Sequence, residues 1–81
     1  MRKGQVLTYA ELHRECAAAV ATCGKSQRAI ALALGVSDGA LSNAVNNAGA
    51  RYARLQARVL QYLDERYNLV EVGGWEVQRT D

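Results

Sequence analysis

The sequence contains no proline, and no apolar run in it approaches the roughly 20 residues that a membrane-spanning helix requires. Its first residues lack the apolar stretch and the small-residue cleavage site of a secretory signal peptide. No segment is repeated, and none is of low complexity. We therefore expect a cytoplasmic protein that makes no contact with a membrane.

Residues that carry chemistry are equally scarce. His13 is the only histidine, and no acidic cluster accompanies it at metal-ligand spacing, so no metal site is expected. Cys16 and Cys23 lie on one expected helix about 10 Å apart, which exceeds the reach of a disulfide, and we expect them to be small buried residues. The chain has no nucleophile beside a base and no phosphate-binding glycine loop. It is therefore not expected to be an enzyme, nor to bind a cofactor or a small-molecule substrate.

What is present is an ordinary small globular composition. The 81 residues are 49% hydrophobic and 22% charged, which predicts one domain over residues 1–81. A core of this size is thin, so association with a second chain is expected from length alone. The charges are unevenly placed: residues 25–54 hold four basic residues and one acidic residue, whereas residues 55–81 are acidic on balance.

The apolar periodicity predicts four helices. Thr8 and Glu11 have the spacing of a capping box, and apolar residues at three- and four-residue intervals extend the first helix over residues 9–23. Ser26 and Ser37 can cap two short helices, over residues 27–34 and 38–46, that are separated by a turn at Gly35. A fourth helix is expected over residues 50–67, ended by Asn68. Its expected inner line consists of Tyr52, Leu55, Val59, Tyr62, Leu63 and Tyr67.

After this helix, apolar residues recur at every second position, which is the spacing of a β-strand. This pattern predicts a C-terminal β-hairpin over about residues 69–79. Gly73 and Gly74 give the signal of a two-residue turn. Such a turn pairs Val72 with Trp75 and Val70 with Val77, and places all four side chains on one face. That face must pack on the helices or pair with a second copy of the chain. The expected fold is mainly α, with four helices and a C-terminal hairpin.

The spacing within residues 26–46 is that of a helix-turn-helix. Two helices that cross steeply need a small residue at the crossing, which Ala31 provides, and a positive φ at the turn, which Gly35 provides. The segment resembles the helix-turn-helix of lambda-repressor-like and Cro-like regulators. The resemblance is carried by Gln27, Ala31, Gly35, Val36, Leu41 and the pair Ala44 and Val45. A weaker similarity to KorA-type plasmid regulators runs through residues 35–45.

The resemblance implies a sequence-specific double-stranded DNA-binding transcriptional regulator, repressor-like and of phage or plasmid type. The helix over residues 38–46 would lie in the major groove, and its base-reading residues would be Asp38, Gly39, Ser42, Asn43 and Asn46. Asn43 ranks first, because an asparagine amide can pair with adenine at two atoms. This helix lacks Arg and Lys. Phosphate contacts would therefore come from Lys25, Ser26, Gln27, Arg28, Ser37, Arg51 and Arg54.

Several of these assignments have alternatives. Asn46 can terminate its helix instead of reading a base, and the row of Arg51, Arg54 and Arg58 is otherwise a solvated helix face. In Cro-like proteins a C-terminal strand commonly provides dimer pairing, so the resemblance favours a homodimer. Its interface would consist of Val70, Val72, Trp75 and Val77. The rival functions are an antitoxin-like or DNA-packaging adaptor, and a protein-interaction module without nucleic acid, which Asp38 and the acidic tail favour.

Overall fold

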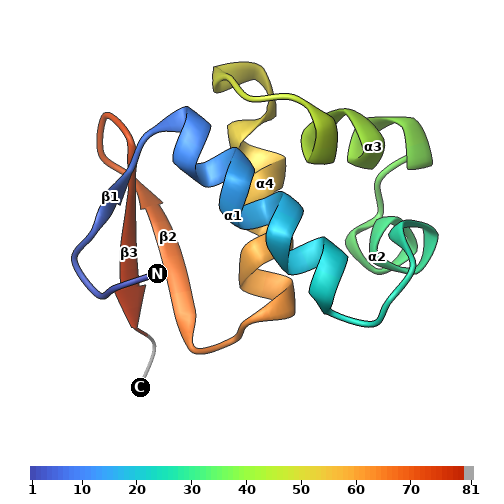
Figure 1. Ribbon diagram of the computed structural model, residues 1–81, viewed down its shortest axis with the longest axis horizontal. Helices are drawn as coiled ribbons and strands as arrows, with labels where there is room; N and C mark the ends of the chain where they lie inside the picture. The colour runs from blue at the N-terminus through green and yellow to red at the C-terminus, as the bar shows by residue number, and fades with distance from the viewer. Residues whose placement is uncertain (80–81) are drawn as a thin grey trace.

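Four helices and a three-stranded sheet make up the fold. A computed structural model describes residues 1–79, with helices α1 (Tyr9–Thr22), α2 (Gln27–Leu34), α3 (Asp38–Asn46) and α4 (Ala50–Leu63). The strands are β1 (Val6–Leu7), β2 (Tyr67–Glu71) and β3 (Trp75–Arg79). In Figure 1, α1 packs against α4 in the middle of the molecule, with the sheet on one side and α2 and α3 on the other. The fold is mainly α with a C-terminal hairpin, as predicted. Within residues 1–79, no helix combines the length and the apolar character needed to cross a membrane.

Side-chain caps define the starts of the first three helices. The Thr8 hydroxyl accepts the Glu11 N–H at 3.2 Å, and the Glu11 carboxylate accepts the Thr8 N–H at 3.1 Å. The hydroxyls of Ser26 and Ser37 each accept the N–H three residues further on. Gly35 ends α2 in the left-handed region, with a φ of 71°. The predicted ranges of α2 and α3 are confirmed, and α1 ends one residue earlier than expected.

The fourth helix ends at Leu63, so the prediction of a helix over residues 50–67 is wrong at its C-terminal end. Asp64 stops it, because its carboxylate accepts the Arg66 backbone N–H at 3.2 Å and the Arg66 guanidinium at 3.0 Å. The guanidinium contact also lowers the pKa of the Asp64 carboxyl. Tyr67, and Asn68 that was expected to end the helix, belong to β2. The turn at Asp64 therefore ends the helix, although the helical spacing of apolar residues continues to Tyr67.

The inner face of α4 also differs from the predicted line. Of the six residues in that line, only Val59 is buried, and the others are half-buried. Tyrosines favour such flanking positions, because their rings pack on apolar neighbours while their hydroxyls stay in water. The buried residues of α4 are Ala53, Gln56, Ala57, Val59 and Leu60.

The sheet is antiparallel with the strand order β1-β3-β2. β1 was not predicted, because a strand of two residues is too short to show an alternating pattern. It covers the outer edge of β3, where Val6 pairs with Glu76 and Leu7 pairs with Trp75. The hairpin is therefore a sheet of three strands, held to the start of α1 through β1.

The hairpin register differs by one residue from the predicted one. Glu71 pairs with Trp75 and Leu69 pairs with Val77, so the loop has three residues and Val72 does not face Trp75. Gly74 lies in this loop against β1, where a Cβ would be 2.9 Å from the Leu7 backbone oxygen. The close approach of β1 therefore requires a glycine at residue 74.

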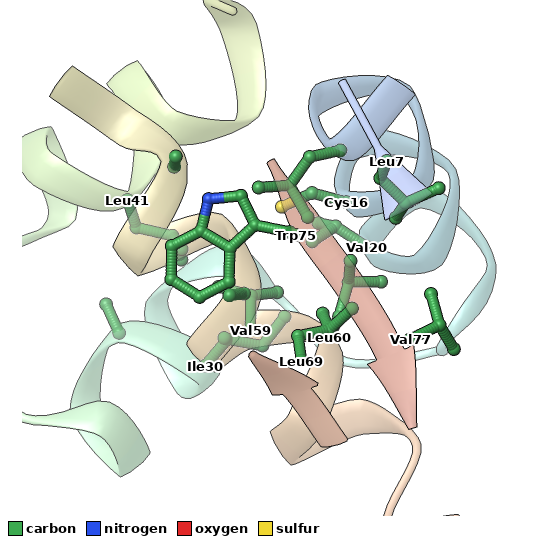
Figure 2. Close-up of a cluster of buried hydrophobic side chains, with 14 residues drawn as sticks. Leu7, Cys16, Val20, Ile30, Leu41, Val59, Leu60, Leu69, Trp75 and Val77 are labelled. Atoms are coloured by element: carbon green, nitrogen blue, oxygen red, sulfur yellow. The ribbon is translucent and has the colours of Figure 1, made fainter. Parts of the chain in front are cut away.

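The corrected register separates the four apolar residues that were expected to share one face. Trp75 and Val77 point into the core and are 7% and 0% exposed, whereas Val72 in the loop is 53% exposed. Val70 pairs with Glu76 on the outer face and is half-buried. The hairpin thus covers its own core with Leu69, Trp75 and Val77. Figure 2 shows the indole of Trp75 among the buried side chains of a core to which every helix and strand contributes.

Candidate nucleic-acid interface

Helix α3 exposes a polar face to solvent. Its buried residues, Leu41 and Ala44, anchor it to the core. The five predicted base-reading residues lie on its other side: Asp38, Gly39, Asn43 and Asn46 are exposed, and Ser42 is half-buried. Within residues 1–79, the Asn43 side chain makes no hydrogen bond, whereas Nδ2 of Asn46 donates to the Ser42 hydroxyl at 3.3 Å. Asn43 is therefore the outward amide that is available to a ligand.

Two side chains from other helices hold the C-terminal end of α3. His13 of α1 lies with its Nε2 atom 2.8 Å from the backbone oxygen of Val45. Gln56 of α4 is fully buried, and its Nε2 atom donates to the backbone oxygens of Ala44 at 2.9 Å and Asn47 at 2.7 Å. Carbonyl groups at the end of a helix have no partner within the helix, so these bonds satisfy them and orient α3.

Neither of these roles was found from the sequence. His13 was considered only as a metal ligand, but it is half-buried and joins α1 to α3. Gln56 was not singled out, although it lies in register with the buried Ala53 and Leu60 on the inner face of α4. That helical spacing is the one signal in the sequence that could have indicated its burial.

Two basic residues near the helix-turn-helix are engaged within the chain. The ammonium of Lys25, a predicted phosphate contact, donates to the Tyr62 hydroxyl at 3.2 Å and lies 4.7 Å from the ring centre. The guanidinium of Arg58 donates to the backbone oxygen of Leu34 at 2.8 Å, at the end of α2. Both side chains therefore help to tie α2 and its preceding loop to α4.

The remaining predicted cations are more available. Arg28 in the first turn of α2 is exposed and, in the described part of the chain, has no partner. Arg51 lies over its neighbour Tyr52 at 5.9 Å. Arg54 approaches Glu71 at 3.8 Å, but its side chain is 83% exposed, so this ion pair is weak.

The starts of α2 and α3 supply further phosphate donors among the predicted residues. The hydroxyls of Ser26 and Ser37 accept backbone N–H groups as caps, and each keeps its own proton to donate. Gln27 is exposed at the start of α2. Backbone N–H groups at a helix start favour an anion, and the exposed start of α2 has no acidic residue in its first turn, whereas the first turn of α3 carries Asp38.

A shallow hollow brings a predicted base reader and a predicted phosphate contact together. Its lining includes Asn43 of α3 and Arg51 of α4, and it has a volume of about 230 Å³. The other lining residues are Ala40, Tyr52 and Leu55. Asn43 of α3 and Arg51 of α4 therefore lie on one continuous surface.

The hairpin does not provide the dimer surface in the form that was predicted. Trp75 and Val77 are buried in the core of their own chain, so they offer little surface to a second copy. The outer edge of β2 is also partly covered, because Gln61 of α4 donates to the Leu69 backbone oxygen at 3.1 Å. A covered strand edge discourages pairing with another chain. Of the four predicted interface residues, Val70 and Val72 remain accessible.

Cys16 and Cys23 are both free thiols, and Cys16 is buried in the core. Burial raises the pKa of the Cys16 thiol to about 11, because the thiolate would lose its contact with water. Among residues 1–79, no three His, Cys, Asp or Glu side chains are grouped so that they could hold a metal ion. A comparison with protein-family models, curated proteins and solved structures finds no match to this chain.

Proposed function

We propose that this chain is a sequence-specific double-stranded DNA-binding regulator that inserts α3 into the major groove. The proposal rests on one observation, that α3 is fixed to the core on one side and exposed on the other. The helix is held from behind by His13 and Gln56, yet its outward face is bare and its Asn43 amide has no partner among the described residues. Such a helix has the width that the major groove admits.

The chemistry of the outward face supports reading of bases. The Asn43 amide can donate to N7 and accept from N6 of adenine, at opposite ends of the same group. Asp38 in the first turn can accept a hydrogen bond from N4 of cytosine. Each well-placed contact of this kind gives about 1–3 kcal/mol of discrimination against the wrong base.

The positive charge around α3 supports contact with the DNA backbone. Arg28 lies in the first turn of α2, and Arg51 and Arg54 lie in the first two turns of α4. Three phosphate contacts per chain predict a slope of about −3 in a plot of log affinity against log salt concentration. A single chain would thus bind weakly at physiological salt.

Selection from a randomised duplex pool, followed by binding measurements on variants, tests the proposal. Asn43→Ala should lose about 1–3 kcal/mol of affinity at an A·T pair and accept other bases there. Arg28→Ala should weaken binding to all sequences alike and reduce the salt slope by about 1. Lys3→Ala is the charge-matched control, because Lys3 lies beside β3 on the opposite side of the molecule from α3 (Figure 1). If neither Asn43→Ala nor Arg28→Ala differs from the parent, the contact face is not the one proposed.

One observation favours a second candidate, a module that binds another protein. Leu32 on the outer side of α2 is 82% exposed, which is unusual for a large apolar side chain on a small domain. An adaptor of the antitoxin or DNA-packaging kind would use such a residue to contact a partner. This candidate gains weight if the parent chain enriches no duplex even at low salt.

A further inference from the structure

Six of the seven glycines have a reason within the chain, and Gly39 has none. Gly74 packs against β1, where a Cβ would approach the Leu7 backbone oxygen to 2.9 Å. Gly39 lies in α3 outside the positive-φ region, and a Cβ there would meet no atom within 4 Å. Neither a turn nor packing therefore requires a glycine at residue 39. The other five glycines adopt a positive φ, which favours glycine: Gly4, Gly24, Gly35, Gly49 and Gly73.

A glycine at residue 39 is unfavourable for the free protein. Within a helix, glycine is less stable than alanine, because the unfolded chain has more backbone freedom to lose. The space beside Gly39 would accept a methyl group without any adjustment of the neighbours. An advantage of glycine at this position must therefore come from something that α3 meets outside the chain.

The position of Gly39 on α3 indicates what the helix meets outside the chain. Asn43 follows it by four residues and Ser42 by three, so the three residues share one side of α3. On this side, Gly39 is the residue that has no side chain to cover the helix backbone. Asparagine has a short side chain, so Asn43 reaches a base edge only if the helix lies deep in the groove.

We propose that the α3 backbone at Gly39 lies in direct contact with the base edges of the major groove of duplex DNA. The missing side chain sets the depth of α3, and Asn43 reads its base at that depth. This inference rests on the proposed function, and it makes Gly39 a positioning residue that determines specificity through its neighbour. A Cβ at residue 39 would lift the helix and separate Asn43 from its base.

The test follows folding and binding in the same variants. Gly39→Ala and Gly39→Leu are compared with the parent, using thermal unfolding of the free chain and affinity for the duplex that the parent selects. Gly39→Ala should unfold at the same temperature or up to about 5 °C higher. It should nevertheless bind at least about tenfold more weakly, with Gly39→Leu weaker still and with the preference at the Asn43 position reduced. Ala18→Leu, on an exposed part of α1 beside the ends of α4 and β2, is the control and should bind like the parent.

Each outcome separates the two proposals. If Gly39→Ala binds the selected duplex as tightly as the parent, the role of Gly39 is disproved while the DNA-binding function stands. If Gly39→Ala loses stability together with affinity, glycine serves the fold and the inference is overturned. If the parent selects no duplex, the proposed function fails, and the inference fails with it.

Discussion

At the residue scale, Gln56 is the side chain on which the orientation of α3 depends most directly. It is fully buried, and one nitrogen atom joins the backbone of α3 to the loop that follows it. Its Oε1 atom is buried without a partner among the described residues. A side chain at residue 56 must therefore supply a hydrogen-bond donor at the place of Nε2.

We expect Gln56→Glu to destabilise the fold although it barely changes the size of the side chain. The substitution places a carboxylate oxygen against two backbone oxygens and buries a charge, which costs about 3 kcal/mol or more. Gln56→Met, which removes the donor without adding a charge, should cost about 1–2 kcal/mol. Urea unfolding at neutral pH measures both, and equal stability of Gln56→Glu and the parent would contradict this account.

The pH dependence of Gln56→Glu provides a second check on the same residue. Burial raises the pKa of a glutamate carboxyl above its value in the unfolded chain, so the penalty is present at high pH and is relieved as pH falls through the folded pKa. The protonated carboxyl also regains an O–H donor for one of the two oxygens. The stability difference from the parent should therefore narrow on acidification.

At the element scale, the hairpin illustrates how a one-residue difference in strand register changes which side chains are buried and which are exposed. In a strand, neighbouring side chains point to opposite faces, so the register decides which of them are buried. The three-residue loop places Leu69, Trp75 and Val77 toward the helices and leaves Val72 in solvent. The sheet consequently serves as a lid on the core.

The observed register predicts very different effects for two residues of the hairpin. Trp75→Ala should cost about 3–5 kcal/mol, because it removes a large side chain that is buried in the core. Val72→Ser should change stability by less than about 0.5 kcal/mol, because Val72 is exposed in the loop. Denaturant unfolding at a dilution at which the chain is monomeric measures both. Similar large losses from the two variants would instead support the two-residue turn.

At the scale of the whole molecule, α3 and the sheet lie on opposite sides of the paired helices α1 and α4 (Figure 1). The surface that we propose for DNA and the exposed residues of the hairpin are therefore separate. A homodimer joined at the hairpin would use Val72 and Val70, the apolar residues left accessible there, and would present two α3 helices to one duplex. Two linked weak sites would compensate for the few cations of one chain.

We expect the parent chain to sediment as a dimer at micromolar concentration and to select a palindrome with half-sites about 10 base pairs apart. Val72→Asp should yield monomers, because it places a charge in the contact, and should bind one half-site weakly. Ala18→Asp adds the same charge on α1 and should remain dimeric. A dimer that persists in Val72→Asp would locate the interface elsewhere, whereas a monomeric parent would remove the homodimer from the proposal.

The starts of α1, α2 and α3 and the turn at Gly35 follow from the amino-acid sequence, because a cap or a positive-φ turn is made by residues within four positions of each other. The outward set on α3 follows for the same reason, since helical spacing alone separates Asn43 from the buried Leu41 and Ala44. Contacts between distant segments decided the rest. β1 exists because β3 is there to pair with it, and the close approach of Leu7 leaves room only for a glycine at residue 74. The roles of His13, Gln56, Lys25 and Arg58 depend on which backbone or ring the fold brings beside them, and no local pattern encodes that neighbour.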